Sequence, residues 1–115
     1  MATGPTVIIG PHDGRTVLLQ WTLGASEAGL PAVVPHKADK TVHVYGTFGG
    51  AVQIEGSLED IGAPAHWEVL RDPQGTLLSG LTARTLKAIL ENVYLIRPVS
   101  GAGVVAVTVR VLIVG

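Results

Sequence analysis

The chain has 115 residues, a length typical of one compact domain, and it contains no cysteine. Hydrophobic residues make up 47% of it and charged residues 15%, a composition that excludes intrinsic disorder for most of the chain. The formal net charge of −1 argues against a nucleic-acid partner, and the missing thiols exclude disulfides and thiolate metal sites. We therefore expect a single β-rich domain over residues 1–115, stabilised by packing or by partners.

Neither end of the chain predicts targeting or membrane insertion. Residues 1–5 lack the positive region and the long apolar stretch of a secretory signal, so we expect cytoplasmic synthesis and a flexible N-terminal arm there. The most apolar run, residues 104–114, is interrupted by Thr108 and Arg110, whereas a membrane helix needs about 20 apolar residues. We expect a strand at this place and no membrane contact.

The N-terminal third predicts two strands and a loop. Fifteen glycines and seven prolines separate short valine-rich runs, which is typical of an all-β domain with many turns. Residues 6–9 predict a first strand, and the Gly/Pro/Asp-rich residues 10–14 predict a turn. Residues 15–23 alternate with period two, so one face should be buried. Residues 24–40 predict a long surface loop. The expected buried set of the second strand is Val17, Leu19, Trp21 and Leu23.

The middle of the chain predicts a β-hairpin. Residues 41–48 and 51–58 both alternate, and Gly49-Gly50 between them is a typical hairpin turn. The expected inward residues are Val42, Val44, Gly46 and Phe48 on the first strand and Val52, Ile54 and Leu58 on the second; His43, Tyr45 and Thr47 are expected outward.

The last half predicts strands with one short helix. Residues 66–70 predict a strand ended by a type I turn at 72–75, after which residues 76–81 are expected to pair back. Residues 82–91 have helical spacing behind a Thr82 cap, and we expect one or two helical turns there. Residues 93–99 and 104–114 predict two more strands. Expected inward residues of the last strand are Val105, Val107, Val109, Val111 and Ile113.

These elements predict an all-β fold, an antiparallel β-sandwich with a jelly-roll-like arrangement of about 7–8 strands. The opposite face of the last strand is only half polar, which makes it a candidate interface with a partner or a second copy. Its residues are Thr108, Arg110, Leu112 and Val114.

No pattern in the sequence predicts catalysis or a cofactor. The histidines at 12, 36, 43 and 66 lie in four separate segments without metal-ligand spacing, so exposed positions are expected for them. Asp13, Glu59, Asp60 and Asp72 lack Asp-x-Asp spacing and are expected to form turns, although such loops can also bind calcium. The serines lie outside any nucleophile motif, and Gly101-Ala102-Gly103 precedes a strand, so it is expected to be a turn and not a phosphate loop. Trp21 and Trp67 sit in alternating strands and are expected in the core.

Three segments of the chain resemble a known type of protein. They are the strand-turn-strand 42–58, with GGAVQIEGS at 49–57; WEVLRDPQG at 67–75; and YLIRP at 94–98, followed by Val-Thr-Val at 107–109. Their order resembles small decoration or cement proteins of tailed-bacteriophage capsids, which have a jelly-roll fold. It is also similar to the galactose-binding, discoidin-like sandwich, in which a Gly-Ser pair precedes a Trp strand and a Tyr/Arg strand follows.

The resemblance implies a non-enzymatic virion protein that binds the outside of a phage capsid and bridges capsid subunits. Its implied partners are the major capsid protein and further copies of this chain, and its implied location is the capsid surface of a virion assembled in the host cytoplasm. A cement role requires a rigid core, semi-apolar faces and a near-neutral charge. Two alternatives stay open: a carbohydrate- or surface-binding β-sandwich module, and a phage neck or tail structural protein.

Overall fold

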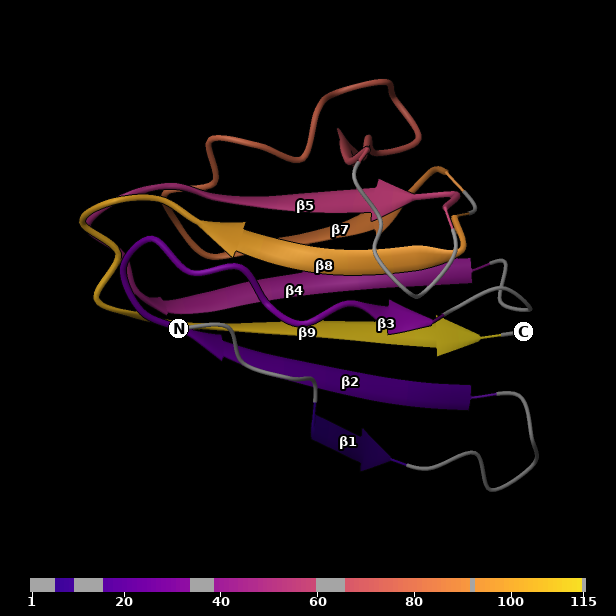
Figure 1. Cartoon of the computed structure of the whole chain (residues 1–115), viewed down its shortest axis with the longest axis horizontal. Helices are drawn as coiled ribbons and strands as arrows, with labels where there is room; N and C mark the ends of the chain where they lie inside the picture. Colours follow the sequence, from indigo (N-terminus) through magenta and orange to yellow (C-terminus); the bar gives the residue numbers. More distant parts are fainter. Residues whose placement is uncertain (1–5, 10–15, 34–38, 60–65, 92, 115) are drawn as a thin grey trace.

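The computed structural model describes residues 6–9, 16–33, 39–59, 66–91 and 93–114, and all regular structure in these ranges is β-strand. None of the described residues builds an apolar helix of membrane-spanning length. The strands, shown in Figure 1, are β1 (Thr6–Ile9), β2 (Thr16–Leu23), β3 (Ala32–Val33), β4 (Asp39–Thr47), β5 (Val52–Ser57), β6 (Glu68–Val69), β7 (Thr85–Ile89), β8 (Leu95–Ser100) and β9 (Ala106–Val114).

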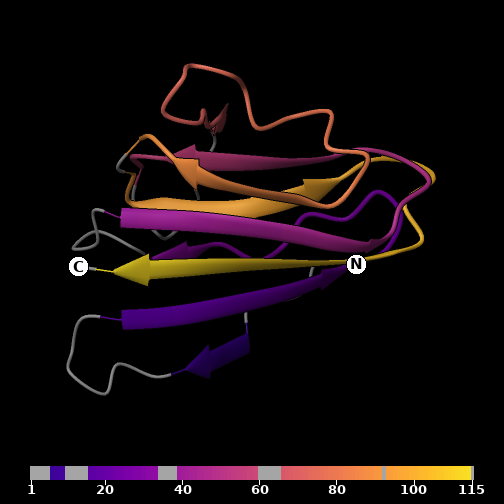
Figure 2. The same ribbon diagram turned by 180° about the vertical axis from the view of Figure 1, so that it is seen from behind.

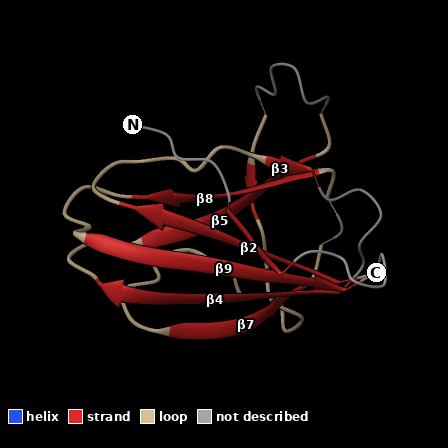
Figure 3. Cartoon of the chain, turned by 90° about the horizontal axis from the view of Figure 1, so that it is seen from below, coloured by secondary structure: helices blue, strands red, loops and turns tan. Residues whose placement is uncertain are grey.

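The strands form two antiparallel sheets, so the predicted all-β sandwich is confirmed. The five-stranded sheet has the order β1-β2-β9-β4-β7, and the four-stranded sheet has the order β3-β8-β5-β6. The pairs β2/β9, β3/β8, β4/β7 and β5/β6 are each hydrogen-bonded, as in one long hairpin rolled up on itself. This nesting of pairs is the jelly-roll arrangement. Figure 3 shows β4, β7 and β9 in a layer apart from β3, β5 and β8.

The core fills the space between the two sheets with aliphatic side chains. Along β9 the buried positions alternate, and Val107, Val109 and Ile113 are at most 1% exposed, as the period of two predicts. Figure 2 shows β9 between β2 and β4 in the five-stranded sheet. Trp21 of β2 is the largest fully buried side chain, and its indole Nε1 donates a hydrogen bond to the Leu30 carbonyl oxygen at 3.0 Å.

The expected hairpin at Gly49-Gly50 is wrong, although both of its strands exist. β4 belongs to the five-stranded sheet and β5 to the four-stranded sheet, so the connection between them crosses from one sheet to the other. Here glycine serves close packing, because a Cβ on Gly50 would lie 2.4 Å from the Ala102 carbonyl oxygen. Gly46 has a φ of 133°, which L side chains rarely adopt. A Cβ at this position would also lie 2.4 Å from the Ala106 carbonyl oxygen, so no side chain fits there.

The helix expected at 82–91 is also wrong, because this segment contains strand β7. Residues Lys40 to Val44 of β4 pair with β7, and these long-range backbone hydrogen bonds prevail over the weak helical spacing. Of the apolar residues that suggested a helix, Ile89 is buried, whereas Leu86 and Leu90 are exposed.

Several finer expectations are settled by the described residues. The turn at 72–75 is confirmed by a hydrogen bond from the Gly75 N–H to the Asp72 carbonyl oxygen at 2.9 Å, and residues 76–81 pair back through an Arg71–Leu77 bridge. Leu58 and Val105 were expected inward but are 79% and 63% exposed, because each lies just outside its strand, where the alternation no longer holds.

The loop expected at 24–40 is partly built into the sheets. It contains β3, and β4 begins at its end with Asp39 and a buried Lys40. The Gly29 N–H also donates to the Pro98 carbonyl oxygen. The expected arm at 1–5 and the expected turn at 10–14 lie outside the described residues.

Candidate functional site

The predicted interface residues lie together on the side of the five-stranded sheet that faces away from the core. Thr108 and Arg110 are half-buried there, and Leu112 and Val114 are 38% and 37% exposed. Their role in an interface stays a prediction. We call this surface the outer face; its members used below are Gln20, His43, Tyr45, Arg84, Leu86, Thr108, Arg110, Leu112 and Val114.

Strand register brings residues from four strands into one row across the outer face. Arg110 of β9 stands opposite Gln20 of β2 on one side and opposite His43 of β4 on the other. His43 in turn stands opposite Leu86 of β7. The Arg110 Nε donates a hydrogen bond of 2.7 Å to the Gln20 Oε1, which holds the guanidinium over the sheet. This row is a product of long-range pairing between strands far apart in the sequence.

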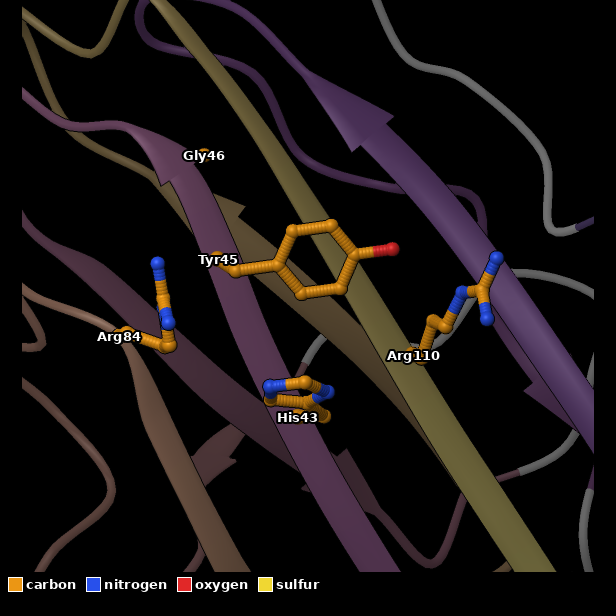
Figure 4. A pocket seen from close by; sticks show the side chains of 5 residues that line it. All are labelled: His43, Tyr45, Gly46, Arg84 and Arg110. Atoms are coloured by element: carbon orange, nitrogen blue, oxygen red, sulfur yellow. The ribbon is translucent and has the colours of Figure 1, made fainter.

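A hollow of about 560 Å³ lies over this row and is lined by His43, Tyr45, Gly46, Arg84 and Arg110. His43 and Tyr45 are two residues apart on β4, so they share a face, and their ring centroids are 4.8 Å apart with the rings tilted by 52°. Figure 4 shows the two rings projecting from β4, with Arg84 on one side and Arg110 on the other. The hollow therefore presents two guanidiniums, a phenol and an imidazole.

The positive charge of this hollow has no counterpart within it. Among the described residues, none that lines the hollow is acidic, and neither Arg84 nor Arg110 forms an ion pair. By contrast, other arginines are paired: Arg97 lies 2.9 Å from Glu55, and Arg71 lies 3.7 Å from Glu91. The outer face is thus the place where the described part of the fold exposes uncompensated cationic groups.

The other histidines and carboxylates of the sequence do not gather into a metal site. Among the described residues no three His, Asp or Glu side chains lie close enough to hold an ion. His43 is in the hollow, and His66 pairs with Glu59 at 3.0 Å. The Glu59 carboxylate, by hydrogen bond and by charge, raises the pKa of His66 above its ordinary value. The residues at 12, 13, 36 and 60 lie outside the described ranges.

Asp72 is a turn-forming carboxylate, as the sequence indicated. Its side chain is 3% exposed, accepts hydrogen bonds from the backbone N–H groups of Gln74 and Thr76, and lies 3.2 Å from the Lys87 ammonium. The hydrogen bond from Thr76 is the largest cause that lowers the pKa of Asp72, and Lys87 lowers it further against the opposing effect of desolvation. The Asp72 carboxylate therefore stabilises the turn at 72–75 through its backbone hydrogen bonds and links this turn to β7 through Lys87.

The serines and the glycine pair near residue 101 also have structural roles. The Ser100 hydroxyl accepts a hydrogen bond from the Glu27 N–H and donates to the Gly24 carbonyl oxygen, which ties the segment after β2 to β8. Gly101 to Gly103 form a turn between β8 and β9, as expected.

Trp67 was expected in the core, and that expectation is wrong. It is half-buried on the four-stranded sheet, where the Arg97 guanidinium carbon lies 4.0 Å above the centroid of its ring. Arg97 also pairs with Glu55, whose side chain is 12% exposed. The strand that precedes Leu70 is only two residues long, so the alternation that predicted burial does not extend back to Trp67.

The sequence predicted Arg110 as a candidate interface residue and placed His43 and Tyr45 outward, but it did not predict that they lie together and it gave no sign of Arg84. The alternation of residues 41–48 already carried the signal for His43 and Tyr45. Arg84 carried none, because its segment was interpreted as helical. Only the pairing of β4 with both β7 and β9 brings the four together.

No protein-family model matches the chain, and no curated protein is similar to it in sequence. Solved structures do share its fold. The SPBc2 prophage-derived protein YomS superimposes with a TM-score of 0.66 at 15% identity, covering 96% of this chain and all of that one. A cupin domain from Bordetella pertussis Tohama I superimposes with a TM-score of 0.55 at 17% identity, covering 100% of this chain and 97% of that one. At such identities the likeness shows a common two-sheet fold.

Proposed function

We propose that this chain is a non-enzymatic virion structural protein that binds the outside of a tailed-bacteriophage capsid and bridges its subunits. The observation that carries the proposal is the outer face, an open sheet surface with exposed aliphatic side chains around a cationic hollow. The likeness to a prophage-derived protein over nearly the whole of both chains supports a phage setting. The resemblance of segments 42–58 and 67–75 to capsid decoration proteins supports the capsid as the place of binding.

The composition of the outer face suits a protein partner. Tyrosine and arginine are enriched at the centres of protein interfaces, and Tyr45 and Arg110 lie in the middle of the face. Leu86 and Leu112, 67% and 38% exposed, add apolar area that a partner would cover. The chain has 6037 Å² of accessible surface, so an interface of about 800 Å² per partner would occupy roughly one-seventh of it. One face of the sheet can supply such an area.

The core explains how so small a protein could act as a cement. Bridging two capsid subunits requires that the domain transmit force without deforming, and the space between its sheets is filled by close-packed aliphatic side chains. The arginines at the surface of the four-stranded sheet are paired, so copies could approach one another with little net repulsion. The proposal thus includes contacts between copies on the capsid lattice.

The test is to purify virions from the source of this chain and to count its copies by quantitative mass spectrometry against the major capsid protein. A decoration protein is expected in a fixed ratio to the capsid protein, with hundreds of copies in each particle. Absence from purified virions would refute the proposal. A count of a few copies per particle would instead assign the chain to the neck or tail.

A second function, a carbohydrate- or surface-binding module, is favoured by Trp67. This indole is only partly buried, and the face of its ring that Arg97 does not cover is the surface on which a sugar would stack. Binding to a glycan panel that Trp67→Ala abolishes, while folding is preserved, would support this function over the capsid role. Thr82→Ala serves as the control, because Thr82 is exposed and does not line the cationic hollow.

A further inference from the structure

We propose that the hollow lined by His43, Tyr45, Arg84 and Arg110 is a carboxylate-binding site that receives an acidic side chain of the partner protein. This inference rests on the proposed function, since it names the chemistry by which the outer face recognises its partner. Three features of the site support the inference: the donors that line the hollow, the missing countercharge and the apolar surroundings.

The first feature is the set of hydrogen-bond donors that line the hollow. A guanidinium is a planar fork of N–H groups that matches the two oxygens of a carboxylate, and it stays charged at any physiological pH. Arg84, directly before β7, and Arg110 of β9 flank the hollow, and the Tyr45 hydroxyl and the His43 ring add further donors between them. All four groups can donate a hydrogen bond to an anion entering from solvent.

The second feature is the missing countercharge. Arg110 is fixed by a neutral partner, the Gln20 amide oxygen, which leaves its charge uncompensated. Lys87 and Arg97 lie on the same small domain and each has a carboxylate within 3.2 Å. Two arginines around one hollow that form no ion pair among the described residues attract an anion to that place, although the whole chain has a net charge of −1.

The surroundings of the hollow favour one kind of anion, a carboxylate on a protein. A nucleic-acid backbone presents a long row of phosphates and needs a basic stripe, whereas two arginines around one hollow fit one or two carboxylates. The exposed Leu86 and Leu112 border the same face, and a docked protein would cover them and remove water from the charged contact. An acidic side chain carried on a folded partner satisfies both the charge and the apolar rim.

The test is a titration of the isotope-labelled full chain followed by two-dimensional NMR. The probes are a hexaglutamate peptide, a hexaglutamine peptide, inorganic phosphate and glucuronate. We expect the hexaglutamate peptide to shift the amide signals around His43, Tyr45 and Arg84 at low salt, and hexaglutamine to leave them in place. Arg84→Gln and Arg110→Gln should each weaken binding about tenfold or more.

Arg71→Gln is the matched control, because Arg71 is an exposed arginine on a different hollow. It should bind hexaglutamate as the unmodified chain does. Arg84 makes no hydrogen bond or ion pair in the described structure, so its variant stays informative even if Arg110→Gln fails to fold.

Signals that move elsewhere, or equal binding by Arg84→Gln, would overturn the inference. Stronger binding of phosphate or of glucuronate than of the peptide would also overturn it, in favour of a free phosphate or an acidic sugar. Because the titration uses the isolated chain, it is decided separately from the virion count. If the chain is present on virions but does not bind hexaglutamate, only this inference is refuted. If the chain is absent from virions, the proposed function is refuted, irrespective of peptide binding.

Discussion

The two tryptophans should differ sharply in what they contribute to stability. Trp21 is 1% exposed in the core and its indole N–H is hydrogen-bonded, so Trp21→Ala leaves a large cavity and should cost about 3–5 kcal/mol. Trp67 has solvent on part of its surface, and its specific contact is the Arg97 guanidinium, worth about 0.5–1 kcal/mol at such a site. Arg97 keeps Glu55 as a partner after Trp67 is removed.

The measurement is urea unfolding of both variants, followed by circular dichroism, with a thermal scan beside it. At about 4 °C of melting temperature per kcal/mol for a domain of this size, Trp21→Ala should melt about 12–20 °C lower and Trp67→Ala about 2–4 °C lower. If Trp21→Ala does not fold, Trp21→Phe provides the smaller perturbation. Equal losses for Trp21 and Trp67 would refute the burial difference on which the fold description depends.

Three further changes test the packing, the charged turn and the topology. Gly29→Ala places a Cβ 2.5 Å from the Trp21 Cδ1 and should cost about 1–3 kcal/mol in a denaturant titration, whereas Gly24→Ala, with its nearest contact at 3.4 Å, should not. Asp72 has a folded-state pKa below its ordinary value of 3.8. Its contribution to the free energy of unfolding is therefore fully present above pH 3.8 and is lost as the pH falls through the folded-state pKa. Asp72→Asn should remove this dependence and flatten the acid limb of a stability–pH curve measured by denaturant unfolding. Deleting residues 104–115 removes the strand between β2 and β4, and a cooperatively melting product would contradict the topology.

Much of the fold was predictable from local pattern. The alternation in residues 17–23, 41–45 and 106–114 survives in the structure because each of these strands buries one face, and burial enforces a period of two. It ends at Gly46, which was expected inward but is exposed. The connection at Gly49-Gly50 was not predictable in this way. Glycine pairs suit a hairpin turn and a tight crossing between sheets equally, and only packing against residues 101–106 distinguishes the two.

The candidate site was predictable in part. Period two placed His43 and Tyr45 on the outward side of one strand and Arg110 on the outward side of another, so the types of residue were visible. Their meeting depends on β4 lying between β7 and β9, so that His43 stands opposite both Leu86 and Arg110, which follow it by 43 and 67 positions. Arg84 directly precedes β7. The spacing of the apolar residues in this segment is compatible with a helix, and only the backbone pairing with β4 makes it a strand.

The central claim, that this chain decorates a phage capsid, is tested most directly by the copy number of the chain in purified virions. Mass spectrometry with labelled reference peptides gives the ratio of this chain to the major capsid protein. If the chain decorates the capsid, this ratio is fixed and corresponds to hundreds of copies per particle. Virions that lack the chain would contradict it.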